Sequence, residues 1–206
     1  MKEFSRGAEA ILFPAAFAGR PCLCKQRFPK HYRVPELDEK LRTTRTKREA
    51  KIIVSAKAAG VPCPSLFHAD LLKKQLFIEK IDAKPLRLVL PKLSHAKQRA
   101  VLSQAGKILA KLHSAGIAHG DSTTSNYLLA PSGQLFLIDF GLSQFSSSEE
   151  EQATDVLLFK KSVSPTQFAW FSKGYEKEMG EKRAGRVFAR LSQIAQRGRY
   201  VSRQGV

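Results

Sequence analysis

Two short polar stretches of the chain contain residue types that handle phosphorylated nucleotides. In HGDSTTSN, Asp121 precedes Asn126 by five residues. In LIDFGLS, an apolar run ends at Asp139, which a phenylalanine and a glycine follow. Phosphoryl transfer needs metal ions that neutralise the phosphates, a carboxylate that orients the attacking hydroxyl, and a lysine on the phosphates. The two stretches could supply the carboxylate and the metal ligands.

The order and spacing of these stretches are typical of protein kinases. There a catalytic aspartate lies five residues before a magnesium-binding asparagine, and an Asp-Phe-Gly turn follows whose acid also holds metal. We therefore predict that Asp121 is the catalytic carboxylate and that Asn126 and Asp139 bind Mg²⁺. The alternative is that Asp121 caps a helix and Asp139 lies in a surface turn. Both motifs together, with a strand between them, favour the kinase interpretation.

A kinase site also needs a strand lysine and a helix acid that pairs with it. Lys25 lies in a short strand-like stretch of the upstream half. Glu49 lies on the turn that leads into the apolar positions of the following helical pattern, so its side chain can point toward a cleft. Glu36 and Glu39 cannot do so from their positions. We predict that Lys25 and Glu49 form the pair, with exposed surface charges as the alternative.

The other nucleotide contacts are expected at two places. The stretch SRGAEA would form the phosphate turn, with Gly7 and Ala8 near the phosphates. Adenine would lie against the connection between the two halves of the chain. Backbone groups of Glu79 and Ile81 could hydrogen-bond the base there, and Ile78 would line the back wall.

The elements predicted around these residues suit a two-lobed molecule. We expect strands at 9–13, 21–26 and 76–81, a helix at 44–59, and helical segments at 102–112, 153–159 and 187–195. Strands dominate the first 80 or so residues, and helices dominate the remainder. This pattern predicts an α+β, bilobal protein-kinase-like fold. A small β-rich N-lobe would span 1–82, and a reduced, mainly helical C-lobe would span 83–206.

Positive charge dominates the composition. The 206 residues include 35 Lys and Arg against 18 Asp and Glu, a net charge of +17. Residues 40–51 carry six cations and one acid, and residues 182–206 carry seven cations and no acid. Such patches favour RNA or another polyanion as partner. The alternative for each patch is a solvated helix face or a frayed basic tail.

Composition excludes several other classes of protein. The hydrophobic content of 43% is enough for a core without disulfides, and three cysteines do not form a disulfide framework. The N-terminal stretch resembles a signal peptide, but Glu3, Glu9 and Pro14 argue against secretion. No apolar run approaches the roughly 20 residues that span a bilayer. We expect a soluble, intracellular protein without a membrane partner.

The chain resembles a known family, the small atypical kinase subunit of the KEOPS (EKC) complex, which is related to the RIO kinases. The resemblance rests on six stretches: GAEAILF (7–13), KQRFPKHYRVPELD (25–38), RTKREA (45–50), HGDSTTSN, LIDFGLS and RGR (197–199). It implies an ATP- and Mg²⁺-dependent Ser/Thr kinase or ATPase that supports synthesis of threonylcarbamoyladenosine on tRNA. The implied partners are the threonylcarbamoyl-transferase subunit, other KEOPS subunits and tRNA. The implied location is cytoplasmic, and also nuclear in a eukaryote.

The same resemblance assigns a role to the C-terminal tail. In the family this tail approaches the active site of the partner and the RNA, which implies a partner- or RNA-binding role for Arg197, Arg199 and Arg203. Here the tail reads YVSRQGV after the last RGR instead of a denser basic run.

Other departures concern the catalytic loop. Gly120 replaces the arginine that reads a phosphorylated activation loop in ordinary kinases, and that loop is missing. Only 65 residues follow the Asp-Phe-Gly turn, which favours ATP hydrolysis or a few bound acceptors over broad kinase activity. His119 is expected to stack beneath Phe140. Within the family, Ser122 stands where a leucine is usual and weakens an apolar contact, and Asp155 is expected to brace the loop through backbone amides.

Two other function classes remain open. One is a small-molecule phosphotransferase of the aminoglycoside or choline kinase type, which shares a His-Gly-Asp loop but usually has a further histidine and a larger C-terminal lobe. The other is a noncatalytic scaffold that binds RNA or a partner. The complete set of polar site residues argues against a scaffold, which has no chemical need for them.

Overall fold

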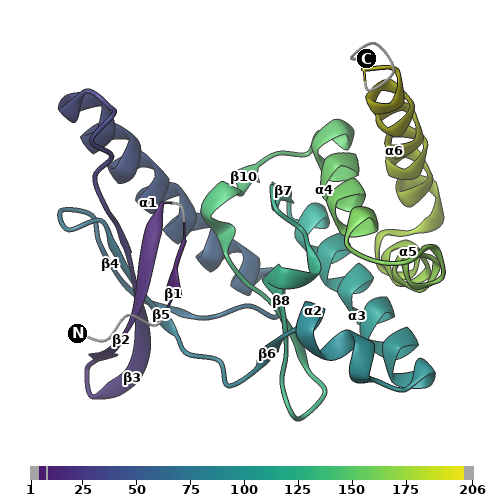
Figure 1. The fold of residues 1–206 in the computed structure, drawn as a ribbon, viewed down its shortest axis with the longest axis horizontal. Helices are drawn as coiled ribbons and strands as arrows, with labels where there is room; N and C mark the ends of the chain where they lie inside the picture. The colour runs from purple at the N-terminus through teal and green to yellow at the C-terminus, as the bar shows by residue number, and fades with distance from the viewer. Residues whose placement is uncertain (1–4, 8, 202–206) are drawn as a thin grey trace.

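The computed structural model describes residues 5–7 and 9–201 (Figure 1). A sheet and one long helix form the N-terminal part, and a group of helices forms the C-terminal part. The predicted α+β fold with a β-rich N-terminal region and a mainly helical C-terminal region is confirmed. The division at residue 82 stays a prediction; this position lies in the connection that follows the N-terminal sheet.

Five antiparallel strands form the N-terminal sheet, in the order β1-β2-β3-β5-β4. Their bounds are β1 (Ser5–Arg6), β2 (Ala10–Phe17), β3 (Arg20–Arg27), β4 (Leu66–Asp70) and β5 (Gln75–Glu79). Lys25 lies on the central strand, opposite Leu12 of β2 and Leu76 of β5. The sheet therefore fixes the backbone of Lys25 from both sides.

Strands β2 and β3 are longer than predicted because their turn is as short as a hairpin allows. Ala18 and Gly19 both have positive φ, 48° and 76°. A two-residue turn of this kind matches the twist of the flanking strands. The ladder therefore continues to the pair Phe17 and Arg20. Strand β4 was not predicted, because a register shift between Leu66 and His68 interrupts its alternation.

Helix α1 (Pro35–Ala58) begins nine residues before the predicted start at Thr44. Pro35 occupies the first turn, where proline removes no helical hydrogen bond. The helix buries Glu49 together with Ile52 and Ile53. Val54, although apolar, lies outside this buried face and is 56% exposed.

The C-terminal part contains short strands and single turns between its helices. The elements are β6 (Lys84–Pro85), α2 (Leu86–Val89), η1 (Leu90–Lys92), α3 (His95–Ser114), β7 (Ile117–Ala118), η2 (Thr124–Asn126), β8 (Tyr127–Leu129), β9 (Leu135–Leu137), η3 (Phe140–Leu142), β10 (Gln144–Phe145), α4 (Glu149–Lys161), α5 (Pro165–Met179) and α6 (Glu181–Val201). Strands β6, β8 and β9 form one small sheet, and β7 pairs with β10. These strands carry the two motif stretches.

Helix α5 was not predicted, although its start has clear signals. The Ser164 hydroxyl accepts a hydrogen bond from the Gln167 amide, Gln167 Oε1 accepts one from the Ser164 amide, and Pro165 occupies the first turn. The apolar face of this helix is aromatic instead of aliphatic, and Gly174 interrupts its pattern. That glycine is required by packing, because a Cβ there would lie 1.9 Å from the Ser103 carbonyl oxygen of α3.

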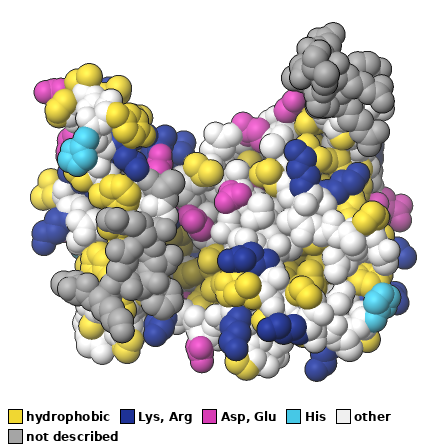
Figure 2. Space-filling model, viewed as in Figure 1, with side chains coloured by type: hydrophobic (Ala, Val, Ile, Leu, Met, Phe, Trp, Pro, Cys, Tyr) yellow, Lys and Arg dark blue, Asp and Glu magenta, His cyan; other side chains and the backbone are white. Residues whose placement is uncertain are grey.

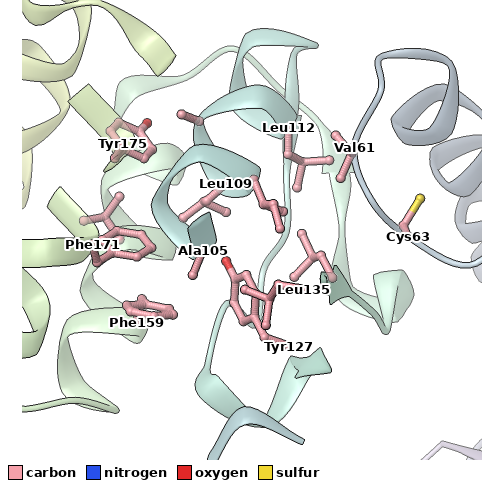
Figure 3. Close-up of a cluster of buried hydrophobic side chains, with 14 of the residues drawn as sticks. Val61, Cys63, Ala105, Leu109, Leu112, Tyr127, Leu135, Phe159, Phe171 and Tyr175 are labelled. Atoms are coloured by element: carbon pink, nitrogen blue, oxygen red, sulfur yellow. The ribbon is translucent and has the colours of Figure 1, made fainter. Parts of the chain in front are cut away.

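The core lies where α3 and α5 pack against the strands of the catalytic loop (Figure 3). Phe159 and Phe171 stack with centroids 4.0 Å apart, and Tyr127 meets Phe159 edge to face. The Pro62 carbonyl accepts a hydrogen bond from the Leu137 amide of β9 at 2.8 Å. The strands that lead into both motifs are thus held against the hydrophobic core. Within the part of the chain that the structure describes, no helix is long and apolar enough to cross a membrane.

Candidate active site

Three of the predicted residues meet at Lys25. Its Nζ donates to Glu49 Oε1 at 2.6 Å and to Asp139 Oδ1 at 2.7 Å. The three side chains come from β3, α1 and the turn before η3, and Lys25 and Asp139 are 114 residues apart in sequence. The predicted pairing of Lys25 with Glu49 is therefore present, and the Asp-Phe-Gly acid lies at the same lysine. Glu36 and Glu39 take no part in these contacts of Lys25.

Mutual charge stabilises this cluster in its ionised form. Burial lowers the pKa of Lys25, but the Glu49 and Asp139 carboxylates outweigh this effect and raise its pKa above the ordinary value. Burial raises the pKa of Asp139, but the Lys25 charge and hydrogen bond outweigh it and lower its pKa. Both groups are therefore charged at neutral pH.

Asp139 has an unusual backbone conformation. Its φ of 62° and ψ of 75° lie in the left-handed region, which costs a residue other than glycine about 1 kcal/mol or more. Its Oδ1 accepts a hydrogen bond from the Gly141 amide at 3.3 Å, which closes the turn. The Asp139 side chain is half exposed. Its carboxylate therefore points out of the turn that follows β9 and is accessible to a ligand.

The other two predicted residues form a second contact. Asn126 Nδ2 donates to the Asp121 carbonyl oxygen at 2.7 Å and to Asp121 Oδ2 at 2.8 Å. Both amide hydrogens of Asn126 face Asp121, which leaves Asn126 Oδ1 to serve as an oxygen ligand. Mg²⁺ prefers carboxylate and carbonyl oxygens. The donor set of Asn126 and Asp139 therefore fits Mg²⁺.

His119 joins the two motif stretches. The ring hydrogen bonds are satisfied together by one neutral tautomer, in which Nε2–H donates to the Ile138 carbonyl at 3.0 Å and Nδ1 accepts from the Asp121 amide at 3.2 Å. Burial lowers the pKa of His119, although Asp155 and other acids oppose this. The ring contacts Phe140 as expected, with centroids 5.4 Å apart, but tilted by 57° instead of stacked. His119 thus positions Asp121 and is not arranged as an acid or base.

Asp155 braces the catalytic loop, as predicted. Its carboxylate accepts the His119 amide at 2.6 Å and the Gly120 amide at 2.8 Å. The structure adds two residues that sequence analysis missed. His113 Nε2 lies 3.0 Å from Asp155 Oδ2, and His113 Nδ1 lies 2.7 Å from the Tyr175 hydroxyl. The one signal in the sequence was His113 itself, a histidine at the end of a predicted apolar helix face. Nothing in the sequence pointed to Tyr175.

Local packing explains two of the departures from related kinases. Gly120 has a φ of +81°, and a Cβ there would lie 2.6 Å from the Leu142 carbonyl oxygen, so a larger residue does not fit this backbone. Ser122 is fully buried and its hydroxyl lies 3.1 Å from the Tyr127 hydroxyl. A polar contact therefore takes the place of the apolar contact that leucine would make.

The predicted adenine and phosphate positions are only partly described. The Glu79 amide already donates to the Ser65 carbonyl at 2.9 Å, so an N–H contact to adenine is left to Ile81. Ile78 lies opposite Leu23 of β3 and packs against the core. The Gly7 amide donates to the Ala10 carbonyl at 2.9 Å and closes the turn between β1 and β2.

Some predicted residues cannot be placed. Ala8 and Arg203 lie outside the described residues. The backbone at Arg197 and Arg199 belongs to α6, so the segment for which a frayed tail was the alternative is helical as far as Val201. The RNA-binding role of these arginines stays a prediction.

The fold and the site together define a protein-kinase-like phosphotransferase. The strand lysine, the helix glutamate and the Asp-Phe-Gly acid are in contact, and the catalytic-loop pair is joined to them through His119 and Ile138. The model of the lipopolysaccharide kinase (Kdo/WaaP) family matches residues 26–181 of the chain. Members of this kinase-like family use a nucleotide as phosphate donor.

Individual relatives place the chain more narrowly. It is 36% identical to the KEOPS complex subunit Bud32 of Pyrococcus abyssi, in an alignment that covers 100% of this chain and 99% of that protein. It is 38% identical to a probable serine/threonine-protein kinase BUD32 homolog of Archaeoglobus fulgidus, over 87% of this chain and 88% of that protein. A probable bifunctional tRNA threonylcarbamoyladenosine biosynthesis protein of Methanothermobacter thermautotrophicus is 36% identical over 95% of this chain, which spans only 36% of that protein. The chain belongs to the Bud32 family of kinases.

Proposed function

We propose that the chain is an ATP-dependent atypical Ser/Thr kinase or ATPase that supports threonylcarbamoyladenosine synthesis on tRNA as a subunit of a KEOPS complex. The observation that carries this proposal is the contact of Lys25 with both Glu49 and Asp139. Phosphoryl transfer needs a positioned lysine on the phosphates and a metal-binding carboxylate near it, and this contact would supply both. The names of the relatives supply the biological setting. The implied place of action is the cytoplasm, and also the nucleus in a eukaryote.

Each site residue has a role in this proposal. Lys25, held by Glu49, would contact the phosphates, and Asp121 would orient the attacking hydroxyl or water. Asn126 Oδ1 and Asp139 would hold Mg²⁺, which neutralises charge on the phosphates when bound. The turn that contains Gly7 and Ala8 would cover the phosphates. Ile78, Glu79 and Ile81 would surround the base.

The connection after the Asp-Phe-Gly turn favours hydrolysis or a few bound acceptors over general protein phosphorylation. Residues 142–148 lead directly to α4, and part of this connection pairs as β10 with β7. Because this backbone already pairs within the sheet, it does not form an extended segment along which a peptide substrate could bind. A small-molecule acceptor is the second candidate, because the matched family model is that of lipopolysaccharide kinases.

Charge and the C-terminal helix support the proposed partners. The net charge of +17 favours tRNA, and Figure 2 shows Lys and Arg side chains gathered along the lower part of the helical half. Arg197, Arg199 and Arg203 would contact the threonylcarbamoyl-transferase subunit or the RNA. Other KEOPS subunits would complete the assembly.

The test is an ATPase assay of the purified chain with and without tRNA and the candidate transferase subunit. We expect magnesium-dependent turnover that the transferase subunit or tRNA changes, and that Asp139→Ala abolishes without loss of the folded state. A wild-type chain without turnover under any of these conditions would reject the enzymatic proposal. Parallel assays with protein and small-molecule acceptors distinguish the two kinase alternatives.

A further inference from the structure

Arg27 makes a contact to the site that neither the kinase motifs nor the family match assigns. It lies two residues after Lys25, so both side chains leave β3 on the same face. Its side chain is 5% exposed, and its Nη2 donates to Glu49 Oε2 at 2.6 Å. Lys25 holds the other oxygen, Oε1, at 2.6 Å. Glu49 is therefore shared between two cations of the same strand.

The other side of Arg27 faces the N-terminal hairpin. Its Nη1 donates to Glu9 Oε2 at 3.3 Å. Glu9 follows the turn at Gly7 and also accepts a hydrogen bond from Arg45 of α1. Although burial raises the pKa of Glu9, its hydrogen bond to Arg45 and the nearby arginine charges outweigh this effect and lower it, so Glu9 is an anion.

The contacts form a row of alternating charge across three elements. In order it runs Arg45, Glu9, Arg27, Glu49, Lys25, Asp139. One end of the row lies on α1 and the other at the Asp-Phe-Gly turn. Because Glu9 and Glu49 are each shared by two cations of the row, displacement of one member changes the contacts of its neighbours.

Arg27 is suited to this place by its shape. A guanidinium has several donors in a rigid plane and can hold two carboxylates at once, whereas an ammonium is a single point of charge. Without Arg27, the buried Glu49 Oε2 loses its partner, and Glu49 can turn away from Lys25.

We propose that Arg27 is a positioning residue, which fixes Glu49 against Lys25 and couples this geometry through Glu9 to the turn that would cover the phosphates. This inference rests on the proposed function, since it concerns the same site. It predicts that the effect of Arg27 on turnover is transmitted through Glu49.

A double-mutant cycle tests this transmission. Arg27→Met keeps the length of the side chain and removes its donors. We expect kcat for ATP to fall about tenfold in the wild-type background and less than about twofold in the Glu49→Gln background, because coupled residues are not additive. Arg27→Lys should restore part of the loss, since an ammonium can reach one carboxylate at a time. Equal losses in the two backgrounds would overturn the proposal.

Arg42→Met is the matched control. Arg42 is a largely buried arginine of α1 that pairs with Asp38 and Glu39 and is outside the row of alternating charge. Its substitution should leave kcat within about twofold of the wild type, and the melting temperatures of all variants are measured beside it. A loss of kcat in Arg42→Met equal to that in Arg27→Met would show a general effect of arginine loss and would overturn the proposal.

The inference can be separated from the proposed function. If the wild-type chain shows no ATP turnover, the enzymatic proposal fails, and calorimetric affinity for a non-hydrolysable ATP analogue with Mg²⁺ replaces kcat. Arg27→Met should then weaken this affinity in the wild-type background and leave it unchanged in Glu49→Gln. Equal weakening in both backgrounds, or none in either, would overturn the positioning role.

Discussion

The N-terminal and C-terminal parts of the site are held together by different forces. Lys25, Glu49 and Arg27 are joined by ion pairs between side chains of a strand and a helix. The catalytic loop is instead held by hydrogen bonds from its backbone to the buried Asp155, which His113 orients. Charge thus organises the half that would contact the phosphates, and a buried hydrogen-bond network organises the half that would carry the catalytic carboxylate.

This difference has a consequence for substitutions. When a cation of the ion-pair row is lost, Glu9 and Glu49 each keep a second cation and Asp139 is half exposed, so the loss should affect activity more than stability. Members of the Asp155 network are buried without access to water, so their loss should affect stability and activity together. The following predictions test that contrast, from the largest effect to the smallest.

Asp155→Ala should have the largest effect. It leaves the amides of His119 and Gly120 and the ring of His113 without their acceptor, and each buried group that loses its partner costs about 1–3 kcal/mol. We expect the free energy of unfolding in urea to fall by about 3 kcal/mol or more and turnover to fall with it. A fully stable Asp155→Ala variant would contradict the described network.

Lys25→Met should separate activity from stability. Loss of the lysine that is proposed to bind the phosphates should lower turnover about a hundredfold or more. The free energy of unfolding should fall by only about 1–2 kcal/mol, below the 3–5 kcal/mol of a fully broken buried pair, because Glu49 keeps Arg27 and Asp139 is half exposed. Turnover and urea unfolding are measured on the same preparation. A stability loss as large as that of Asp155→Ala would remove the contrast.

His119 should make the C-terminal part sensitive to acid. Its pKa is lowered in the folded state, so between pH 7 and pH 5 the unfolded chain binds more protons and stability falls as the pH falls. One group contributes a slope of at most about 1.4 kcal/mol per pH unit. His119→Asn should reduce the slope measured by urea unfolding, while His113 remains in both proteins. Identical slopes would show that His119 is not held neutral.

Ser122→Ala should have the smallest effect. It removes a buried hydrogen bond to Tyr127 and should lower the free energy of unfolding by about 1 kcal/mol. Tyr127→Phe in the same chain should recover most of the loss, because both polar groups are then absent. Full additivity of the two substitutions would contradict a direct contact.

The site could be predicted from sequence where chemistry fixes the spacing. Two short motifs identify Asp121, Asn126 and Asp139 by their spacing. Lys25 and Glu49 could be found from their positions in a predicted strand and a predicted helix. The structure brings Lys25, Glu49 and Asp139 into one contact and Asp121 and Asn126 into another, and their catalytic roles remain predictions. Arg27 and the His113 network could not be found in this way, because their partners lie 18–62 residues away and no motif links them.

The fold was predictable in class and less so in its bounds. Two of the missed features have local signals: Pro35 begins a helix that was predicted to start only at Thr44, and Gly174 permits close packing within a helix that was not predicted. Strand β4 is recognisable only by its pairing with β5, since its own pattern is irregular.

The most direct test of the account is a calorimetric titration of ATP into the wild type and Asp139→Asn, each with and without Mg²⁺. If Lys25, Asp139 and Asn126 form one nucleotide and metal site, Mg²⁺ should tighten nucleotide binding to the wild type and have little effect on Asp139→Asn. The same Mg²⁺ dependence in both proteins would contradict the central claim that Asp139 and Lys25 act on one bound nucleotide.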